Sequence, residues 1–242
     1  MQVDVTFVIP QINGNPNLNG KTAVVIDALR ATSTMVTALY HGALEVIPVL
    51  EPAEAVELAK NIGSSECMVG GERKGIKVEG FHLGNSPLEY SEAAIAKKKV
   101  VLCTTNGTKA VKLAAQHAAE VLIASFLNLK TVAQALIAKD QDVTIVCAGR
   151  GNWGTSLEDL ACAGAIIDAV TGSGAVVTLT DGATTALYAF EAAKTTGLEA
   201  YFRRTDNGQN LVDIGLAADL AACAALDSMP VLPKYQNGRV IL

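Results

Sequence analysis

The chain has 242 residues and a formal net charge of −5, with 50% hydrophobic and 18% charged residues. This composition predicts a folded globule and excludes a disordered chain, in which low hydrophobicity accompanies high charge. The net negative charge argues against a nucleic-acid partner, which would require clustered Lys and Arg. Positive charge at any ligand site therefore has to be local.

The apolar runs are short, as in Ala23–Ile26, and lie far below the roughly 18 to 20 residues of a membrane span. The first residues lack the basic start and apolar core of a signal peptide. We therefore expect no membrane partner and a cytoplasmic location. Five widely spaced cysteines form no Cys-x-x-Cys pair, which predicts reduced core residues rather than a zinc site.

Short apolar runs alternate with amphipathic stretches along most of the chain. We expect strands near residues 3–9, 22–27, 45–50, 66–70, 99–104, 120–124, 142–147 and 175–180. Helices between strands indicate an α/β fold with three α/β/α layers and a mostly parallel, mixed central sheet. No linker rich in Pro, Gly or Ser interrupts residues 1–242, which favours a single domain.

From about residue 182 the pattern becomes Ala-rich and helical, through Ala183–Thr195 and Leu216–Leu226. Asn237-Gly238 in the tail predicts a hairpin turn. Two earlier helix starts carry their own signatures. Ser86-Pro87-Leu88-Glu89 fits a capping box with Pro at the first helical position, and Ser156-Leu157-Glu158-Asp159 places carboxylates at a helix N-terminus.

Four polar segments each follow an expected strand: residues 27–32, 70–87, 104–108 and 149–154. In open α/β sheets ligands bind beyond the carboxyl ends of parallel strands. If these strands are parallel, the four segments share one edge of the sheet. The segment 70–87, "GGERKGIKVEGFHLGNSP", is long for a loop without regular structure, which favours a functional role.

This edge would gather oxygen donors for a hard cation from Asp27, Glu72, Glu158 and Asp159. Its basic residues are Arg30, Arg73, Lys74, Lys77, Lys109 and Arg150. Carboxylates beside cations around a small polyanion are typical of metal-assisted phosphoryl transfer.

Simpler interpretations stand beside these. Asp27 could only cap the next helix, and Thr104–Thr108 could be an ordinary turn rather than an anion cradle. Residues Gly149–Gly154 fit G-x-G-x-x-G, the pattern of a dinucleotide site. Glu158 and Asp159 would repel a pyrophosphate there, which favours a metal site instead. Trp153 could wall the pocket or only pack.

The segments "VVIDALRATST", "GGERKGIKVEGFHLGNSPLEY", "CTTNGTKA" and "CAGRGNWGTSLEDLACAGAI" resemble, in order, the motifs of the ComB family, the 2-phosphosulfolactate phosphatases. The resemblance covers roughly residues 22–167 and continues more loosely to the C-terminus. It implies an α/β fold and a Mg²⁺-dependent phosphatase that converts 2-phospho-3-sulfolactate to 3-sulfolactate and phosphate, a step of coenzyme M biosynthesis. The family usually has Asp where this chain has His82.

We therefore expect catalytic roles for Asp27, Glu72 and Asp159, and metal ligands among Asp27, Glu72, Glu158 and Asp159. We expect substrate-binding roles for Arg30, Arg73, Lys77, Asn85, Thr104, Thr105, Asn106, Gly107, Thr108 and Arg150. Direct attack by water, with Asp159 or Glu72 as base, is preferred over an aspartyl phosphate on Asp27. The rival hypotheses are a dinucleotide-dependent oxidoreductase and a noncatalytic module that binds a phosphorylated metabolite. The sequence leaves a homodimer open.

Overall fold

The computed structural model describes residues 1–13, 15–63, 65–151 and 154–242. All its strands belong to one sheet of eleven, in the order β5-β4-β6-β3-β11-β10-β7-β2-β8-β1-β9. The strands are β1 (Gln2–Thr6), β2 (Thr22–Ile26), β3 (Glu45–Val49), β4 (Cys67–Arg73), β5 (Ile76–Lys77), β6 (Lys99–Cys103), β7 (Glu120–Ala124), β8 (Val143–Cys147), β9 (Thr178–Leu179), β10 (Lys234–Gln236) and β11 (Arg239–Ile241). Every expected strand is therefore present, although β9 has only two residues.

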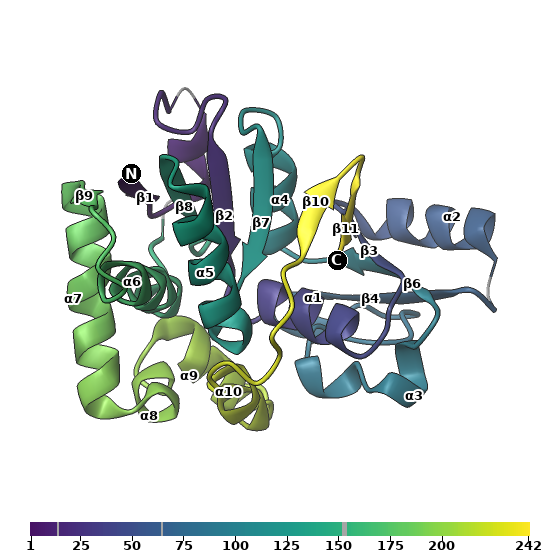
Figure 1. Cartoon of the computed structure of the whole chain (residues 1–242). Helices are drawn as coiled ribbons and strands as arrows, with labels where there is room; N and C mark the ends of the chain where they lie inside the picture. Colours follow the sequence, from purple (N-terminus) through teal and green to yellow (C-terminus); the bar gives the residue numbers. More distant parts are fainter. Residues whose placement is uncertain (14, 64, 152–153) are drawn as a thin grey trace.

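Helices cover both faces of this sheet (Figure 1). They are α1 (Ala31–Tyr40), α2 (Pro52–Ile62), α3 (Glu92–Ile95), α4 (Gly107–Ala114), α5 (Leu129–Lys139), α6 (Leu157–Thr171), α7 (Asp181–Thr196), α8 (Leu198–Phe202), α9 (Asp206–Asp213) and α10 (Ala218–Cys223), with 3₁₀ turns at Ile9–Ile12, Pro87–Glu89 and Phe126–Asn128. This confirms the expected α/β/α layers around a mostly parallel, mixed sheet. No helix of the described residues combines the length and apolar character needed to cross a membrane.

Alternation of side chains along the strands builds the separate cores. In β2, Val24 and Ile26 join the cluster beneath α5, α6 and α7, while Ala23 and Val25 join the cluster on the opposite face. Successive side chains of a strand point to opposite faces, so the apolar run Ala23–Ile26 contributes to both cores at once. This is why the strand reads as a continuous apolar run.

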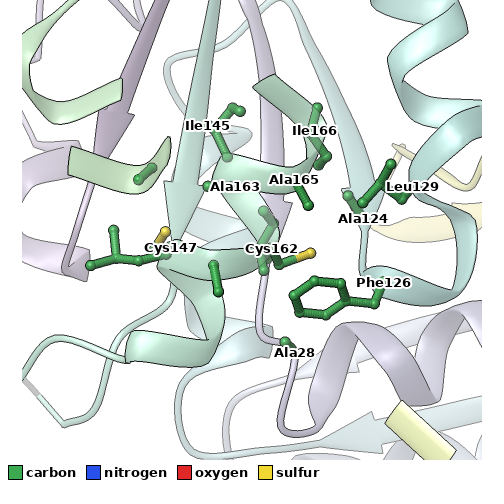
Figure 2. Close-up of a cluster of buried hydrophobic side chains, with 14 of the residues drawn as sticks. Ala28, Ala124, Phe126, Leu129, Ile145, Cys147, Cys162, Ala163, Ala165 and Ile166 are labelled. Atoms are coloured by element: carbon green, nitrogen blue, oxygen red, sulfur yellow. The ribbon is translucent and has the colours of Figure 1, made fainter. Parts of the chain in front are cut away.

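The five cysteines are free and buried, as expected. Cys147 on β8 and Cys162 on α6 lie in the same cluster, near Phe126 and Ala28 (Figure 2). Burial raises the pKa of both thiols well above the usual value. They therefore behave as small apolar side chains of the core.

The sheet consists of two parallel groups of strands joined by the C-terminal hairpin. Strands β4, β6 and β3 form one group, and β7, β2, β8, β1 and β9 form the other. Between them β10 and β11 make only antiparallel pairs, with β7 and β3 respectively. The turn Asn237-Gly238, with φ of 49° and 84°, confirms the predicted hairpin turn.

The two groups cross rather than align, as Figure 1 shows. Sheets twist, and here the twist accumulates across the hairpin. The carboxyl ends of β4 and β6 therefore meet those of β2 and β8 around one cavity, although the groups are not parallel to each other.

Two local predictions in the segment 70–87 are wrong. Strand β4 runs on to Arg73 and turns back into β5, so the segment begins as a hairpin rather than a loop. Ser86 caps no helix, because its hydroxyl donates to Asp219 Oδ1 (2.6 Å) and only a 3₁₀ turn follows. Glu89 instead accepts a hydrogen bond from the backbone N–H of Gly84 (2.8 Å).

Candidate active site

A cavity of about 370 Å³ lies where the four polar segments meet. It is lined by Asp27, Leu29, Arg30, Glu72, Lys74, Gly75, Asn85, Thr105, Asn106, Arg150, Gly151, Asn207, Asn210 and Leu211. The first eleven belong to the four polar segments predicted from the sequence, residues 27–32, 70–87, 104–108 and 149–154. The last three come from α9, which the sequence did not suggest.

Asp27 directly follows the buried strand β2 and is 9% exposed. Its Oδ1 accepts a hydrogen bond from the backbone N–H of Ala31 (3.2 Å) at the start of α1, so it does cap that helix. Its Oδ2 accepts no hydrogen bond from any described residue. Burial, reinforced by the negative charges of Glu72 and Glu158, raises the pKa of Asp27 to about 7.

Glu72 joins two of the segments around the cavity. Its Oε1 accepts a hydrogen bond from the backbone N–H of Thr105 and its Oε2 accepts one from Gly75, both at 2.7 Å. The side chain, on β4, is only 7% exposed. Each oxygen keeps a second lone pair for a ligand.

Glu158 and Asp159 lie in the first turn of α6, as predicted, and neither lines the 370 Å³ cavity. Asp159 accepts hydrogen bonds from the backbone N–H groups of Ala28 (2.8 Å) and Gly149 (3.1 Å), so it ties the segments after β2 and β8 together. Burial and the nearby Asp27 and Glu158 charges raise its pKa well above the usual value. A carboxylate so engaged is better suited to hold the loops than to act as a base.

Glu158 lines a neighbouring cavity of about 210 Å³, which shares Arg150 and Asn207 with the larger one. Its Oε1 accepts a hydrogen bond from the Asn207 side chain (2.5 Å), and its buried Oε2 has no partner among the described residues. Burial raises the pKa of Glu158. The four acidic residues Asp27, Glu72, Glu158 and Asp159 are all buried and are called the inner carboxylates below.

The predicted basic residues separate into different environments. Arg30 lines the cavity but forms a buried ion pair with Asp219 (2.6 Å) on α10. Arg73 points elsewhere, because its guanidinium donates to the carbonyl oxygens of Leu50 (2.5 Å) and Glu72 (2.9 Å). Lys77 is exposed and does not line the cavity.

Lys74 and Arg150 are exposed at the cavity and are called the outer cations below. Arg150 pairs with Asp206 (2.5 Å), whose side chain is 80% exposed. Lys74 makes no hydrogen bond or ion pair within the described part of the chain. The sequence predicts a substrate-binding role for Arg150, whereas it places Lys74 only among the basic residues of this edge.

The residues of the Thr104–Thr108 segment contribute unequally to the wall of the cavity. Thr105 and Asn106 line the cavity, whereas the hydroxyl of Thr104 accepts the backbone N–H of Thr108 (3.1 Å) as a local cap. Gly107 is required for packing, since a Cβ there would lie 2.4 Å from the Ala31 side chain and 2.7 Å from Asp27 Oδ2. The segment is therefore partly a cap and partly a wall of the cavity.

Asn85 also lines the cavity, and its buried Oδ1 has no hydrogen-bond partner among the described residues. His82 lies outside the cavity lining, where its Nδ1 accepts the backbone N–H of Val69 (3.0 Å). The prediction for Trp153, and residue 152 of the segment 149–154, fall outside the described residues. The backbone N–H of Gly149, which a dinucleotide phosphate would need, is already bound by Asp159.

Oxygen donors of the kind that Mg²⁺ prefers line the cavity. No group of three or more His, Cys, Asp or Glu side chains among the described residues is placed to hold a metal. Mg²⁺, however, normally keeps several waters and binds one or two carboxylates plus substrate phosphate. Asp27 Oδ2 and the unpartnered Asn85 Oδ1 are oxygen donors of the required kind at the same cavity.

Sequence reasoning missed Asp219, Asn207 and Asn210. Asp219 is 1% exposed and accepts hydrogen bonds from both Arg30 and Ser86. An acidic residue within the otherwise apolar "GLAADLAACAAL" is a signal that could have pointed to it. For the two asparagines, in "DNGQN", the sequence carries no comparable signal.

Buried carboxylates facing exposed cations, at the carboxyl ends of β2, β4, β6 and β8, define an α/β enzyme site for a small anion. A family model described as 2-phosphosulpholactate phosphatase matches residues 7–238. A protein of Symbiobacterium thermophilum named probable 2-phosphosulfolactate phosphatase is 42% identical over 225 residues, which cover 93% of this chain and 95% of that protein.

Two clostridial proteins of the same name are also similar. The Clostridium acetobutylicum protein is 37% identical over the whole of both chains, and the Clostridium perfringens protein (strain SM101) is 39% identical, over 99% of this chain and 96% of that protein. The chain therefore belongs to the 2-phosphosulpholactate phosphatase family, a family of phosphoric monoester hydrolases. This confirms the resemblance seen in the sequence.

Proposed function

We propose that this chain hydrolyses 2-phospho-3-sulfolactate to 3-sulfolactate and phosphate with Mg²⁺, as a step towards coenzyme M. The observation that carries the proposal is the placement of Asp27 and Glu72 in one cavity with Lys74 and Arg150. The names of the related proteins support the substrate. The substrate's phosphate, sulfonate and carboxylate match a site with local positive charge in an acidic protein.

In this mechanism Asp27 Oδ2 and Asn85 Oδ1 would hold the metal ion. When bound, Mg²⁺ supplies neutralising charge to the phosphoryl oxygens. Burial of Asp27 and its attachment to Ala31 fix the carboxylate before substrate arrives, and such preorganisation is what makes electrostatic stabilisation effective. Asn106, at the start of α4, orients the phosphoryl group from the opposite segment.

Glu72 acts as the base that takes a proton from the attacking water. It lines the cavity, and its two N–H partners hold it in place while each oxygen keeps a free lone pair. Asp159, the other predicted base, has both oxygens bound to backbone N–H groups outside the cavity lining. The new bond joins the water oxygen to phosphorus, the bond from phosphorus to the 2-oxygen of sulfolactate breaks, and that oxygen keeps the electron pair and takes up a proton from solvent.

The test is phosphate release from a panel of phosphorylated hydroxy acids, with Mg²⁺ and with EDTA. We expect release from 2-phospho-3-sulfolactate with Mg²⁺ and its loss in EDTA. Activity unchanged by EDTA would contradict a role for the metal. Substrate binding without phosphate release would favour a noncatalytic module. Labelled phosphate trapped on Asp27 would show that the reaction passes through an aspartyl phosphate and not through direct attack by water.

A further inference from the structure

The charge of Arg30 is already neutralised within the protein. Its Nη1 lies 2.6 Å from Asp219 Oδ2, and the two side chains are 3% and 2% exposed. Its Nη2 donates to the carbonyl oxygen of Gly75 (2.8 Å). A guanidinium in a buried pair with a carboxylate adds little net positive charge to the cavity.

Arg30 holds the tip of the β4–β5 hairpin, Lys74 and Gly75, at the cavity. Gly75 at this tip donates its N–H to Glu72 and accepts from Arg30, so both its polar backbone groups are bound by residues of the cavity wall. Gly75 has a φ of 83°, and a Cβ there would lie 2.9 Å from Ile214 and 3.1 Å from Asn210 Nδ2. The tip is therefore fixed against the α9 side of the cavity.

Lys74 precedes Gly75 in the two-residue turn between Arg73 and Ile76, and its φ is 54°. Such left-handed turn positions favour Asn, Asp or Gly, and a Lys is disfavoured there. Residues in such conformations tend to occur at functional sites. The exposed Lys74 side chain lines the cavity and has no hydrogen-bond or ion-pair partner within the described part of the chain.

We infer that Lys74 determines substrate specificity by binding an acid group remote from the phosphate, namely the sulfonate of a sulfonated hydroxy acid. This inference rests on the proposed function for the substrate class. Arg150, the other outer cation, has Asp206 as its own counterion, whereas Lys74 has none among the described residues. The turn backbone is held through Gly75, and the exposed Lys74 ammonium at the cavity is suited to distinguish a sulfonate from a neutral group there.

The test is equilibrium binding of 3-sulfolactate and of lactate to the full-length protein, by titration calorimetry with Mg²⁺ present. The variant Lys74→Asn removes the charge and installs a residue that the turn favours, so the fold is retained. The matched control is Lys97→Asn, because Lys97 is exposed, has a similar φ of 61° and lies outside the cavity lining.

We expect Lys74→Asn to weaken binding of 3-sulfolactate about 10- to 100-fold, the range for a charge-assisted hydrogen bond, and to leave lactate binding unchanged. Lys97→Asn should match the wild type. Equal 3-sulfolactate affinity in wild type and Lys74→Asn, or a wild type that does not prefer 3-sulfolactate over lactate, would overturn the inference.

Phosphate release from 2-phospho-3-sulfolactate, measured on the same proteins, separates this inference from the proposed function. Selective binding that depends on Lys74, without phosphate release, would contradict the phosphatase and leave the inference standing. Phosphate release with an unchanged KM in Lys74→Asn would support the phosphatase and contradict the inference.

Discussion

The inner carboxylates and the outer cations lie around the same site but are held in different ways. Asp27, Glu72 and Asp159 are each fixed by backbone N–H groups, and all four inner carboxylates are at most 9% exposed. The outer cations, by contrast, are exposed side chains at the cavity mouth. One set is fixed by the fold, and the other can adjust to a ligand.

This difference indicates a division of tasks. Burying several acids together is costly, and the raised pKa values of Asp27, Glu158 and Asp159 express that cost. Such clusters are typical of functional sites, where a bound cation relieves the repulsion. Flexible cations at the rim instead favour recognition, because their contacts form when the ligand arrives.

The largest effect is expected from Asp27→Asn, which removes a charge of the inner set while keeping the shape of the side chain. We predict about a 10³-fold fall in kcat for phosphate release, comparable with the loss of a preorganised electrostatic group. The matched control is Asp181→Asn, at the exposed start of α7. A kcat within about threefold of the wild-type value for Asp27→Asn would contradict the assigned role.

The next largest effect is expected on the free energy of unfolding, when the buried ion pair of Arg30 and Asp219 is broken. We expect Asp219→Ala to lower the free energy of unfolding by about 3–5 kcal/mol, because it leaves Arg30 buried without its counterion. Glu199→Ala, which breaks the exposed pair with Arg203, should change it by less than about 1 kcal/mol. Urea denaturation measures both, and equal losses would show that the pair is not buried as described.

The pH dependence of stability tests the burial of Asp27 in metal-free protein. Its pKa is raised from 3.8 to about 7, so the stability it contributes is fully present below about pH 4 and is lost as pH rises through about 7. In EDTA, we therefore expect the wild type to lose roughly 2 kcal/mol relative to Asp27→Asn between about pH 5 and about pH 8. Parallel pH profiles in urea denaturation would contradict a raised pKa.

The smallest effect is expected at the exposed pair of Arg150 and Asp206. Asp206→Asn should change the free energy of unfolding by less than about 0.5 kcal/mol, because an exposed ion pair is screened by water. It should also lower KM by about twofold, since Arg150 no longer has to leave a counterion to meet the substrate. A higher KM would show that Asp206 holds Arg150 in its binding position.

Much of this arrangement can be predicted from local sequence. The runs "AVVI" and "VVLC" are apolar because β2 and β6 are buried on both faces, so the strands and the polar segments that follow them are recognisable. The convergence of those segments follows from the rule for open sheets. Asp27 and Glu72, predicted in this way, both line the cavity.

The rest depends on contacts between distant parts of the chain. The turn at Asn237-Gly238 is visible in the sequence, but its insertion between β7 and β3 is not, because register with distant strands has no local signal. Arg73 and Lys74 are adjacent charged residues of one hairpin, and only the turn geometry sends Lys74 to the cavity and Arg73 to Leu50. Asp219 reaches Arg30 only because the C-terminal helices fold back over the site.

The most direct test of the division between inner carboxylates and outer cations is the steady-state kinetics of 2-phospho-3-sulfolactate hydrolysis by wild type, Asp27→Asn and Lys74→Asn, at saturating Mg²⁺. We predict that Asp27→Asn lowers kcat with little change in KM. We predict that Lys74→Asn raises KM by about tenfold or more with little change in kcat. A fall in kcat of equal size in both variants would contradict this division.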